Sequence, residues 1–346
     1  MKDNDRLCFT SDYTEGAYPT ILERLVEINY EKNSGYGLDK YSDAAREKIR
    51  AAVNAPEADI YFISGGTQTN ALIIDSLLRP YQGVIAADSG HISVHEAGAI
   101  EFGGHKVLTV KESNGKLRAE GIEDLINAYN KDANREHMVM PGMVYISQPT
   151  ELGTLYSLQE LKEISRVCRE NSVPLYVDGA RLAYALSCPE NDVSLTDLGS
   201  LCDVFYIGGT KCGALFGEAV VIPKHDLIPH IYTMIKQHGA LLAKGWVAGI
   251  QFDTLFTDDL YLRIGNPAIK EAERIRKTLL EKGYELSFSS PTNQIFVLLT
   301  KAKAEELSEN VEMSFWENVD EDRLIMRIAT SWATKSEDVD RLLSVL

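Results

Sequence analysis

Short apolar runs alternate with amphipathic stretches through the middle of this chain. In residues 158–171, apolar side chains recur at every third position from Leu158 to Val167, a spacing that predicts a helix with one buried face. Strands that alternate with such helices indicate a mostly parallel sheet covered on both faces. The pattern predicts strands over 59–63, 83–87, 105–109, 143–147, 175–177, 203–207 and 219–222, and helices over 42–53, 67–78, 121–130 and 158–171.

The last hundred residues show a looser order that is typical of an α+β domain. They predict a helix over 266–282, a strand over 294–299, a helix over 301–310, a strand pair over 311–316 and 323–329, and a helix over 335–345. We therefore expect residues 1–250 to form an N-terminal segment and a large domain, and residues 251–346 a small C-terminal domain. The first forty residues have weak periodicity, and we expect them to pack on the small domain or on a partner subunit.

Composition excludes several classes of partner. The chain has 346 residues, 45% of them hydrophobic, enough for a large core, and its formal net charge of −16 disfavours nucleic acid and anionic membranes. The opening segment MKDNDRLCFT is polar, so we expect no secretory signal, and no apolar run is long enough to span a bilayer. The five cysteines are scattered without a Cys-x-x-Cys pair, which argues against disulfides and zinc and favours the cytoplasm.

A segment of small and hydroxyl residues, Ser64 to Asn70, follows one predicted strand and opens the next helix. Small residues such as Gly66 let a ligand approach the backbone, and free N–H groups at a helix start favour an anion. Thr67 or Thr69 would add a hydroxyl. An ordinary helix cap is the alternative, and neither a G-x-G-x-x-G pattern nor a Walker lysine is present.

Two charged residues follow later strands. Asp178 ends an apolar strand, where a carboxylate could keep a pyridinium nitrogen protonated; it could also simply cap the next helix. Lys211 lies just beyond the next strand among glycines, which leaves room for a bulky ring beside it. Desolvation there would lower the lysine pKa and favour imine formation, whereas an exposed lysine in a turn is the alternative.

His91 follows a predicted strand and a glycine, where an imidazole could stack on a flat ring or transfer a substrate proton. A structural histidine is the alternative. His95, four residues later, could share a metal with it on a helix, but no third ligand is evident and we expect no metal. The order of phosphate loop, ring-stacking histidine, aspartate and lysine points to pyridoxal 5'-phosphate (PLP).

With these motifs, the chain resembles the threonine aldolase/β-eliminating lyase family of fold-type-I PLP enzymes, from Ser11 to Arg327. The most specific segments are Gly66-Thr67-Gln68-Thr69-Asn70, His91 with Glu96-Ala97-Gly98, Asp178-Gly179-Ala180-Arg181, and Thr210-Lys211. The resemblance implies a three-layer αβα domain, like that of PLP-dependent transferases, with a mostly parallel seven-stranded sheet and a small C-terminal α+β domain. It also implies homodimers or homotetramers with active sites at subunit interfaces.

The resemblance assigns roles by position. Lys211 would form the Schiff base, Asp178 would pair with the pyridine nitrogen, and His91 would stack on the ring. The cofactor phosphate would be held by Gly66, Thr67, Gln68 and a partner's Lys244; the substrate would be bound by Ser11, Tyr36 and Arg327, and Arg181 would serve both substrate and cofactor.

One departure from the family concerns the substrate side chain. Where threonine aldolases have a Glu-Asn-Thr-His segment, this chain has Gln148 to Glu151, so Glu151 replaces a histidine that positions the substrate hydroxyl. The leading hypothesis is a carbon–carbon lyase that cleaves a threonine-like β-hydroxy-α-amino acid to glycine and an aldehyde, with His91, Glu151 or a water that they hold as base. Alternatives are β-elimination on another amino acid, amino transfer, PLP binding without catalysis, and an unrelated α/β protein.

Overall fold

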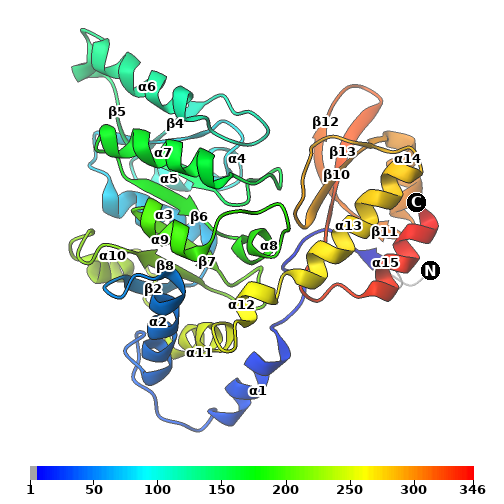
Figure 1. Cartoon of the computed structure of the whole chain (residues 1–346), viewed down its shortest axis with the longest axis horizontal. Helices are drawn as coiled ribbons and strands as arrows, with labels where there is room; N and C mark the ends of the chain where they lie inside the picture. The colour runs from blue at the N-terminus through cyan, green and yellow to red at the C-terminus, as the bar shows by residue number, and fades with distance from the viewer. Residues whose placement is uncertain (1–5) are drawn as a thin grey trace.

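The computed structural model describes residues 6–346, which form a large domain and a small domain joined by the long helix α13 (Asn266–Glu281) (Figure 1). The large domain is built on a seven-stranded sheet of order β2-β8-β7-β6-β5-β3-β4. Strand β8 runs opposite to the other six strands, which all run in one direction. The implied α/β class with a mostly parallel sheet is therefore confirmed. The strands are β2 (Asp59–Ile63), β3 (Gln82–Ala87), β4 (Lys106–Val110), β5 (Met140–Ser147), β6 (Leu175–Asp178), β7 (Val204–Gly208) and β8 (Glu218–Ile222).

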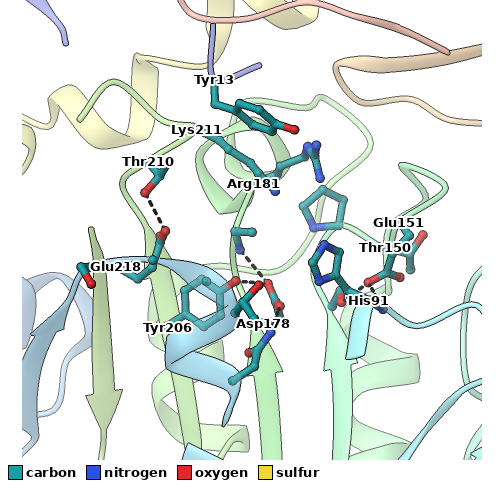
Figure 2. Close-up of a pocket in the computed structure, with 18 residues that line it drawn as sticks. Tyr13, His91, Thr150, Glu151, Asp178, Arg181, Tyr206, Thr210, Lys211 and Glu218 are labelled. Carbon is teal, nitrogen blue, oxygen red and sulfur yellow. Dashed lines mark hydrogen bonds between the residues drawn. The ribbon is translucent and has the colours of Figure 1, made fainter. Parts of the chain in front are cut away.

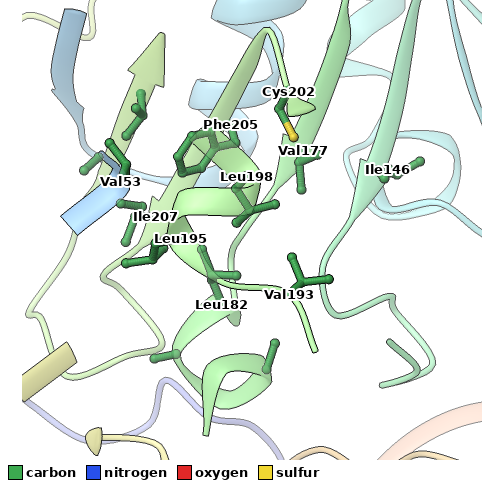
Figure 3. Packing of buried hydrophobic residues seen from close by; sticks show 14 of the residues in the cluster. Val53, Ile146, Val177, Leu182, Val193, Leu195, Leu198, Cys202, Phe205 and Ile207 are labelled. Atoms are coloured by element: carbon green, nitrogen blue, oxygen red, sulfur yellow. The ribbon is translucent and has the colours of Figure 1, made fainter. Parts of the chain in front are cut away.

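Helices cover both faces of this sheet because successive strand residues point to opposite sides. In β3, Ile85 faces one layer, and Val84 and Ala86 face the other. The first layer contains α2 (Lys40–Val53), α6 (Ala119–Lys131), α7 (Leu158–Glu170), α8 (Leu182–Leu186), α9 (Leu195–Leu201), α11 (Trp246–Leu255) and α12 (Leu260–Arg263). The second contains α3 (Gly66–Leu77), α4 (His91–Val94), α5 (Ala99–Phe102) and α10 (Ile231–Gln237). Figure 3 shows the first layer, where Leu198 of α9 faces Phe205 of β7.

Local signals set the ends of the helices that the sequence predicted. In α7, the Ser157 side chain accepts a hydrogen bond from the Glu160 N–H, and the Glu160 carboxylate accepts one from the Ser157 N–H. This capping box satisfies two of the N–H groups that a helix start leaves unpaired. In α2, the Asp39 side chain accepts hydrogen bonds from Tyr41 N and Ser42 N.

The small domain is built on a four-stranded antiparallel sheet, and α13 and α15 pack against it (Figure 1). Ile295 and Val297 of β10 share one core with Ile275 of α13 and Val339 of α15. The elements of the small domain are β9 (Glu285–Leu286), β10 (Gln294–Thr300), α14 (Lys301–Ser308), β12 (Ser314–Asn318), β13 (Arg323–Ala329) and α15 (Ser336–Val345). The large domain also contains a short 3₁₀ turn (Arg135–His137).

The N-terminal segment joins the small domain. Strand β1 (Leu7–Cys8) pairs in parallel with β11 (Val311–Glu312), so the start of this segment packs on the small domain, one of the two expected positions. The strand predicted over 311–316 is therefore wrong in one respect: it is two strands, because β11 pairs with β1 and β12 pairs with β13. Helix α1 (Pro19–Glu27) follows and contacts α11 at the edge of the large domain (Figure 1).

The expected division at residues 250 and 251 falls inside α11. Phe252 and Leu255 of this helix are buried in the large-domain core, which continues as far as Ile269, whereas the small-domain core begins at Ala272. We propose that the large domain extends into α13 and that the N-terminal strand belongs to the small domain. Residues 1–5 of the polar opening segment lie outside the described residues. Among the helices of residues 6–346, none combines the length and apolarity needed to cross a membrane.

Candidate active site

A cavity of about 340 Å³ opens at the carboxyl ends of the parallel strands (Figure 2). This is the edge of an open α/β sheet at which ligands collect. Most of the residues selected from the sequence line it, although they come from distant parts of the chain. They are Gly66, Thr67, His91, Glu151, Asp178, Arg181 and Lys211.

The start of α3 forms one end of this cavity. Its N-cap residue, Gly65, has no side chain to satisfy the first N–H groups of the helix, which leaves them available to an anion. A Cβ on Gly66 would lie 3.2 Å from the Tyr206 hydroxyl, so a glycine keeps this end of the cavity open. Gln68 does not line the cavity. Its side chain accepts a hydrogen bond from Ser64 Oγ at 2.6 Å and donates one to the His238 carbonyl.

Asp178, at the end of β6, is buried and held as a carboxylate. It accepts hydrogen bonds from the hydroxyls of Tyr145 (2.7 Å) and Tyr206 (2.5 Å), from Asn70 Nδ2 (3.0 Å) and from the Ala180 N–H (3.0 Å). Burial opposes its ionisation, but the imidazole of His91 and these hydrogen bonds keep the pKa of Asp178 below its ordinary value. An ionised carboxylate at this point can hold a ring nitrogen protonated.

Lys211 follows β7 on a tight turn, and its side chain reaches into the cavity (Figure 2). Burial, together with the positive charge of Arg181, lowers the pKa of Lys211, as the sequence predicted for an imine-forming amine. The ring of Tyr13, from the N-terminal segment, lies 6.0 Å from the Lys211 Nζ and forms part of the opposite wall.

His91 begins α4, and its ring is fixed by a carboxylate. Its Nδ1 lies 2.7 Å from Glu96 Oε1, which also accepts a hydrogen bond from Asn70 Nδ2 at 2.7 Å. The same nitrogen of Asn70 also donates to Asp178, so the Asn70 amide links the carboxylates of Glu96 and Asp178. This network orients the His91 ring and limits its movement.

Glu151 lies next to His91 at the cavity wall. Its Oε1 accepts hydrogen bonds from the His91 N–H (2.9 Å) and from Ser147 Oγ (2.7 Å). Burial raises the pKa of Glu151, although the Ser147 hydrogen bond opposes the shift. A carboxylate with a raised pKa can exchange a proton nearer neutral pH, which suits a general base.

Arg181 is already paired with a carboxylate of the protein. Its Nε and Nη2 donate to the two oxygens of Asp12 at 2.6 and 3.0 Å, and Asp12 also accepts from Asn293 Nδ2 at 2.9 Å. These contacts hold the pKa of Asp12 at about 2 despite its burial. Within residues 6–346, Nη1 of Arg181 has no hydrogen-bond partner, so this nitrogen can still bind a substrate carboxylate.

A second part of the site lies between the domains. Arg327 of β13 donates to Gln294 Oε1 and to the Thr10 carbonyl, both at 3.1 Å, and its guanidinium lies 5.7 Å from the Trp316 ring. It lines a pocket with His91, Glu151, Arg181 and Lys211. The small domain therefore supplies a cation and an aromatic wall to the cavity of the large domain.

Three other selected residues do not line either pocket. Ser11 is buried, and its hydroxyl has no partner in the part of the chain that the structure describes. Tyr36 and Lys244 lie on adjacent loops, where the Tyr36 N–H donates to the Ala243 carbonyl at 3.3 Å. The described residues of one chain therefore do not bring Ser11, Tyr36 or Lys244 into the cavity, and their roles remain predictions.

Several residues that line the cavity were not predicted from the sequence. Tyr206 donates to Asp178, and Glu218 of β8 is buried beside Lys211. A glutamate at the start of an otherwise apolar strand was a usable signal for Glu218, because a buried charge requires a partner. The hydroxyl of Tyr206 gave no comparable signal, since tyrosine is common in buried strands.

Within residues 6–346, a group of three side chains could hold a metal: Asp59, His225 and Asp226. They lie outside the cavity, and both ring nitrogens of His225 already contact carboxylates, Asp59 at 2.8 Å and Asp226 at 3.3 Å. The expectation of no metal remains a prediction.

The cavity fits PLP. The open start of α3 suits a phosphate, the ionised Asp178 suits a pyridinium nitrogen, and Lys211 suits an aldehyde. A family model described as "Beta-eliminating lyase" matches residues 9–300.

The chain belongs to the beta-eliminating lyase family. It is 30% identical over 305 residues to the low specificity L-threonine aldolase of Pseudomonas aeruginosa, with 86% of each chain covered. A solved structure of Leishmania major threonine aldolase superimposes with a TM-score of 0.94, at 43% identity over 98% of both chains. Membership makes this protein a PLP-dependent lyase of fold type I. An aspartate aminotransferase of Thermus thermophilus, 15% identical with 99% of this chain and 91% of that one covered, has a TM-score of 0.73 and shares the fold.

Proposed function

We propose that this enzyme cleaves the Cα–Cβ bond of a β-hydroxy-α-amino acid to give glycine and an aldehyde. The observation that carries the proposal is that Lys211, Asp178 and His91 share one cavity with Glu151, beside the cations Arg181 and Arg327. The relatives named as threonine aldolases support it, because they match over most of the chain.

Substrate binding would begin at the two arginines. Nη1 of Arg181 and the guanidinium of Arg327 would bind the substrate carboxylate, a geometry that arginine favours. Fixing the carboxylate turns the Cα–Cβ bond toward the position in which it can break. Lys211 is the residue to which the cofactor would be attached, and Asp178 would hold the ring nitrogen protonated. When bound, PLP supplies an electron-withdrawing ring that takes up the electrons of the broken bond.

Glu151 would accept the proton of the β-hydroxyl group. Its Oε1 is occupied by the His91 N–H and Ser147 Oγ, and Oε2 has no hydrogen-bond partner among residues 6–346. Since this glutamate stands where the family has a histidine, we propose that the two residue types perform the same proton transfer. The ring of His91, fixed by Glu96, would cover the cofactor.

The second candidate is β-elimination from another amino acid. The description of the matching family model favours it, and the same cofactor site serves both reactions. The products distinguish them, because aldol cleavage gives glycine and an aldehyde whereas elimination gives ammonia and a keto acid.

We also propose that the enzyme is a cytoplasmic homodimer or homotetramer that binds neither nucleic acid nor membranes. The five cysteines are all unpaired, which suits a reducing compartment, and the net charge is −16. Lys244 is exposed on a loop outside the cavity and would reach the phosphate of a neighbouring subunit, with Tyr36 beside it.

The test combines spectroscopy with product analysis. With added PLP, the wild type should show a visible absorbance band that borohydride removes, and Lys211→Ala should lack it. The wild type should then release glycine from threonine, allo-threonine or phenylserine. A band without glycine release, but with ammonia, would replace aldol cleavage by elimination. No band in either protein would refute the cofactor site.

A further inference from the structure

A carboxylate lies at the end of the cavity where an anion is expected. Glu218, the first residue of β8, is 3% exposed and lines the cavity together with Gly65, Gly66 and Thr67 at the start of α3 (Figure 2). The register explains this position, because Glu218 pairs with Ile63, the last residue of β2 before the chain turns into α3. A buried negative charge here would oppose binding of a phosphate.

Hydrogen bonds fix both oxygens of Glu218. Oε2 accepts from the Gly209 N–H at 3.0 Å, and Oε1 accepts from Thr210 Oγ1 at 2.8 Å. The Thr210 hydroxyl also accepts from the Gly217 N–H at 2.9 Å. A hydroxyl has one hydrogen, and in this arrangement that hydrogen points to Glu218. Thr210 therefore offers the cavity a lone pair rather than a donor, which is again unfavourable for an anion.

The surroundings of Glu218 favour a change in its protonation. Burial raises the pKa of Glu218 to about 7, although the two hydrogen bonds and the charge of Lys211 oppose the shift. The titratable groups that interact with it are Asp178 and Tyr176 on β6, Tyr206 on β7, Lys211 and Cys212 after β7, and Tyr261 on α12. The facing ends of β2 and α3, residues 63–70, contain no titratable side chain.

We propose that Glu218 takes up a proton when the cofactor phosphate binds, and that this proton turns the Thr210 hydroxyl into a donor to the phosphate. The neutral carboxyl O–H would donate to Thr210 Oγ1, which then accepts two hydrogen bonds and directs its own hydrogen into the cavity. Where Glu218 is ionised in the free protein, one proton enters from solvent for each phosphate bound, and no covalent bond changes. The inference rests on the proposed function and on the fit of the start of α3 to the cofactor phosphate.

Proton uptake makes phosphate binding depend on pH. Below about pH 7 Glu218 is already neutral and has no effect on affinity. Above that value, the dissociation constant should rise about tenfold for each pH unit, because each binding event must first protonate the carboxylate. The dependence should continue until the pH reaches the higher pKa of Glu218 in the complex.

The experiment uses 4-deoxypyridoxine 5'-phosphate with the full-length apoenzyme. This analogue lacks the aldehyde, so the covalent chemistry of Lys211 does not contribute. Its dissociation constant is measured from pH 6.5 to 9, and calorimetry in buffers of different ionisation enthalpy counts the protons. For the wild type, the dissociation constant should rise about tenfold for each pH unit above pH 7, and close to one proton should be taken up at pH 8. Glu218→Gln, whose amide can donate permanently to Thr210, should lose the slope and bind at least about tenfold more tightly at pH 8.5.

Three controls separate the explanations. Phosphate-free 4-deoxypyridoxine should bind wild type and Glu218→Gln alike. Glu271→Gln, which changes a similarly buried glutamate in helix α13, outside the cavity, should keep the pH dependence. The slope should also survive in a Lys211→Met background, which excludes titration of the lysine.

An unchanged slope in Glu218→Gln, or weaker binding at every pH, would overturn the inference. If that variant does not fold, the proton count of the wild type decides: no proton uptake at pH 8 would refute it. Failure of the proposed function is distinguishable, because it would appear as a visible band without release of glycine, whereas failure of the cofactor site would appear as no band with PLP at any pH.

Discussion

The ion pair between Asp12 and Arg181 makes a quantitative prediction for Asp12→Asn. The carboxylate is 1% exposed, and its pKa is lowered from 3.8 to about 2. At about 1.4 kcal/mol per pKa unit, the shift corresponds to about 2 to 3 kcal/mol of stability at neutral pH. The new amide must also point its NH₂ group at Arg181 or Asn293, both of which are donors, at a cost of about 1 kcal/mol. We expect a total destabilisation of about 3 kcal/mol.

The pH dependence has a definite sign. Because the pKa of Asp12 is lower in the folded state, its stabilising contribution is complete well above pH 3.8 and is lost as the pH falls toward 2. Urea unfolding of the apoenzyme, followed by circular dichroism, should show a gap between wild type and variant that narrows by about 1 kcal/mol from pH 7 to pH 3. The KM for substrate should rise more than kcat falls, because Arg181 loses its orientation.

Asp43→Asn is the matched control, since Asp43 also pairs with an arginine but its side chain is 70% exposed. Such a surface pair contributes at most about 1 kcal/mol. A gap below about 1 kcal/mol for Asp12→Asn at pH 7, or a gap that widens on acidification, would refute the reasoning.

Three further variants test other parts of the site. Asp178→Asn should still bind PLP through Lys211 but lose turnover by about a hundredfold or more, because the ring nitrogen is no longer held protonated; near-normal turnover would count against that role. Glu151→Gln should lose aldol cleavage. Because burial raises the pKa of Glu151, thermal unfolding should show the variant to be more stable than the wild type at pH 7 but not at pH 4. Equal stability of the two proteins at both pH values would contradict the burial argument. Gly179→Ala places a Cβ 2.0 Å from the Tyr206 carbonyl oxygen and should cost about 3 kcal/mol or more, whereas Gly16→Ala, which meets nothing within 4 Å, should be neutral.

The sequence predicted the large domain well because its signals are local. A buried parallel strand is a short apolar run, and the helix after it has its own periodicity and caps, so β5, α7 and β6 could each be located from fewer than fifteen residues. The strand predicted over 311–316 failed for the opposite reason. Its division into β11 and β12 depends on pairing with β1, about three hundred residues away in the chain.

The residues of the candidate site also differ in whether the sequence alone could predict them. Asp178 and Lys211 could be selected from the sequence because each follows a recognisable strand, and parallel strands end at one edge of a sheet. The pairing of Arg181 with Asp12 could not, because the two residues lie 169 positions apart and meet only when the N-terminal segment crosses the large domain.

The sequence by itself therefore determined which residues can carry PLP chemistry and the order in which they occur. Only the tertiary structure decided what surrounds each of them: that Glu151 contacts His91, that Asn70 links Asp178 to Glu96, and that Glu218 lies beside Thr210 at the start of α3. The physical reason is that residue type and local periodicity are written in neighbouring positions, whereas burial, charge pairing and protonation depend on groups brought together from separate elements.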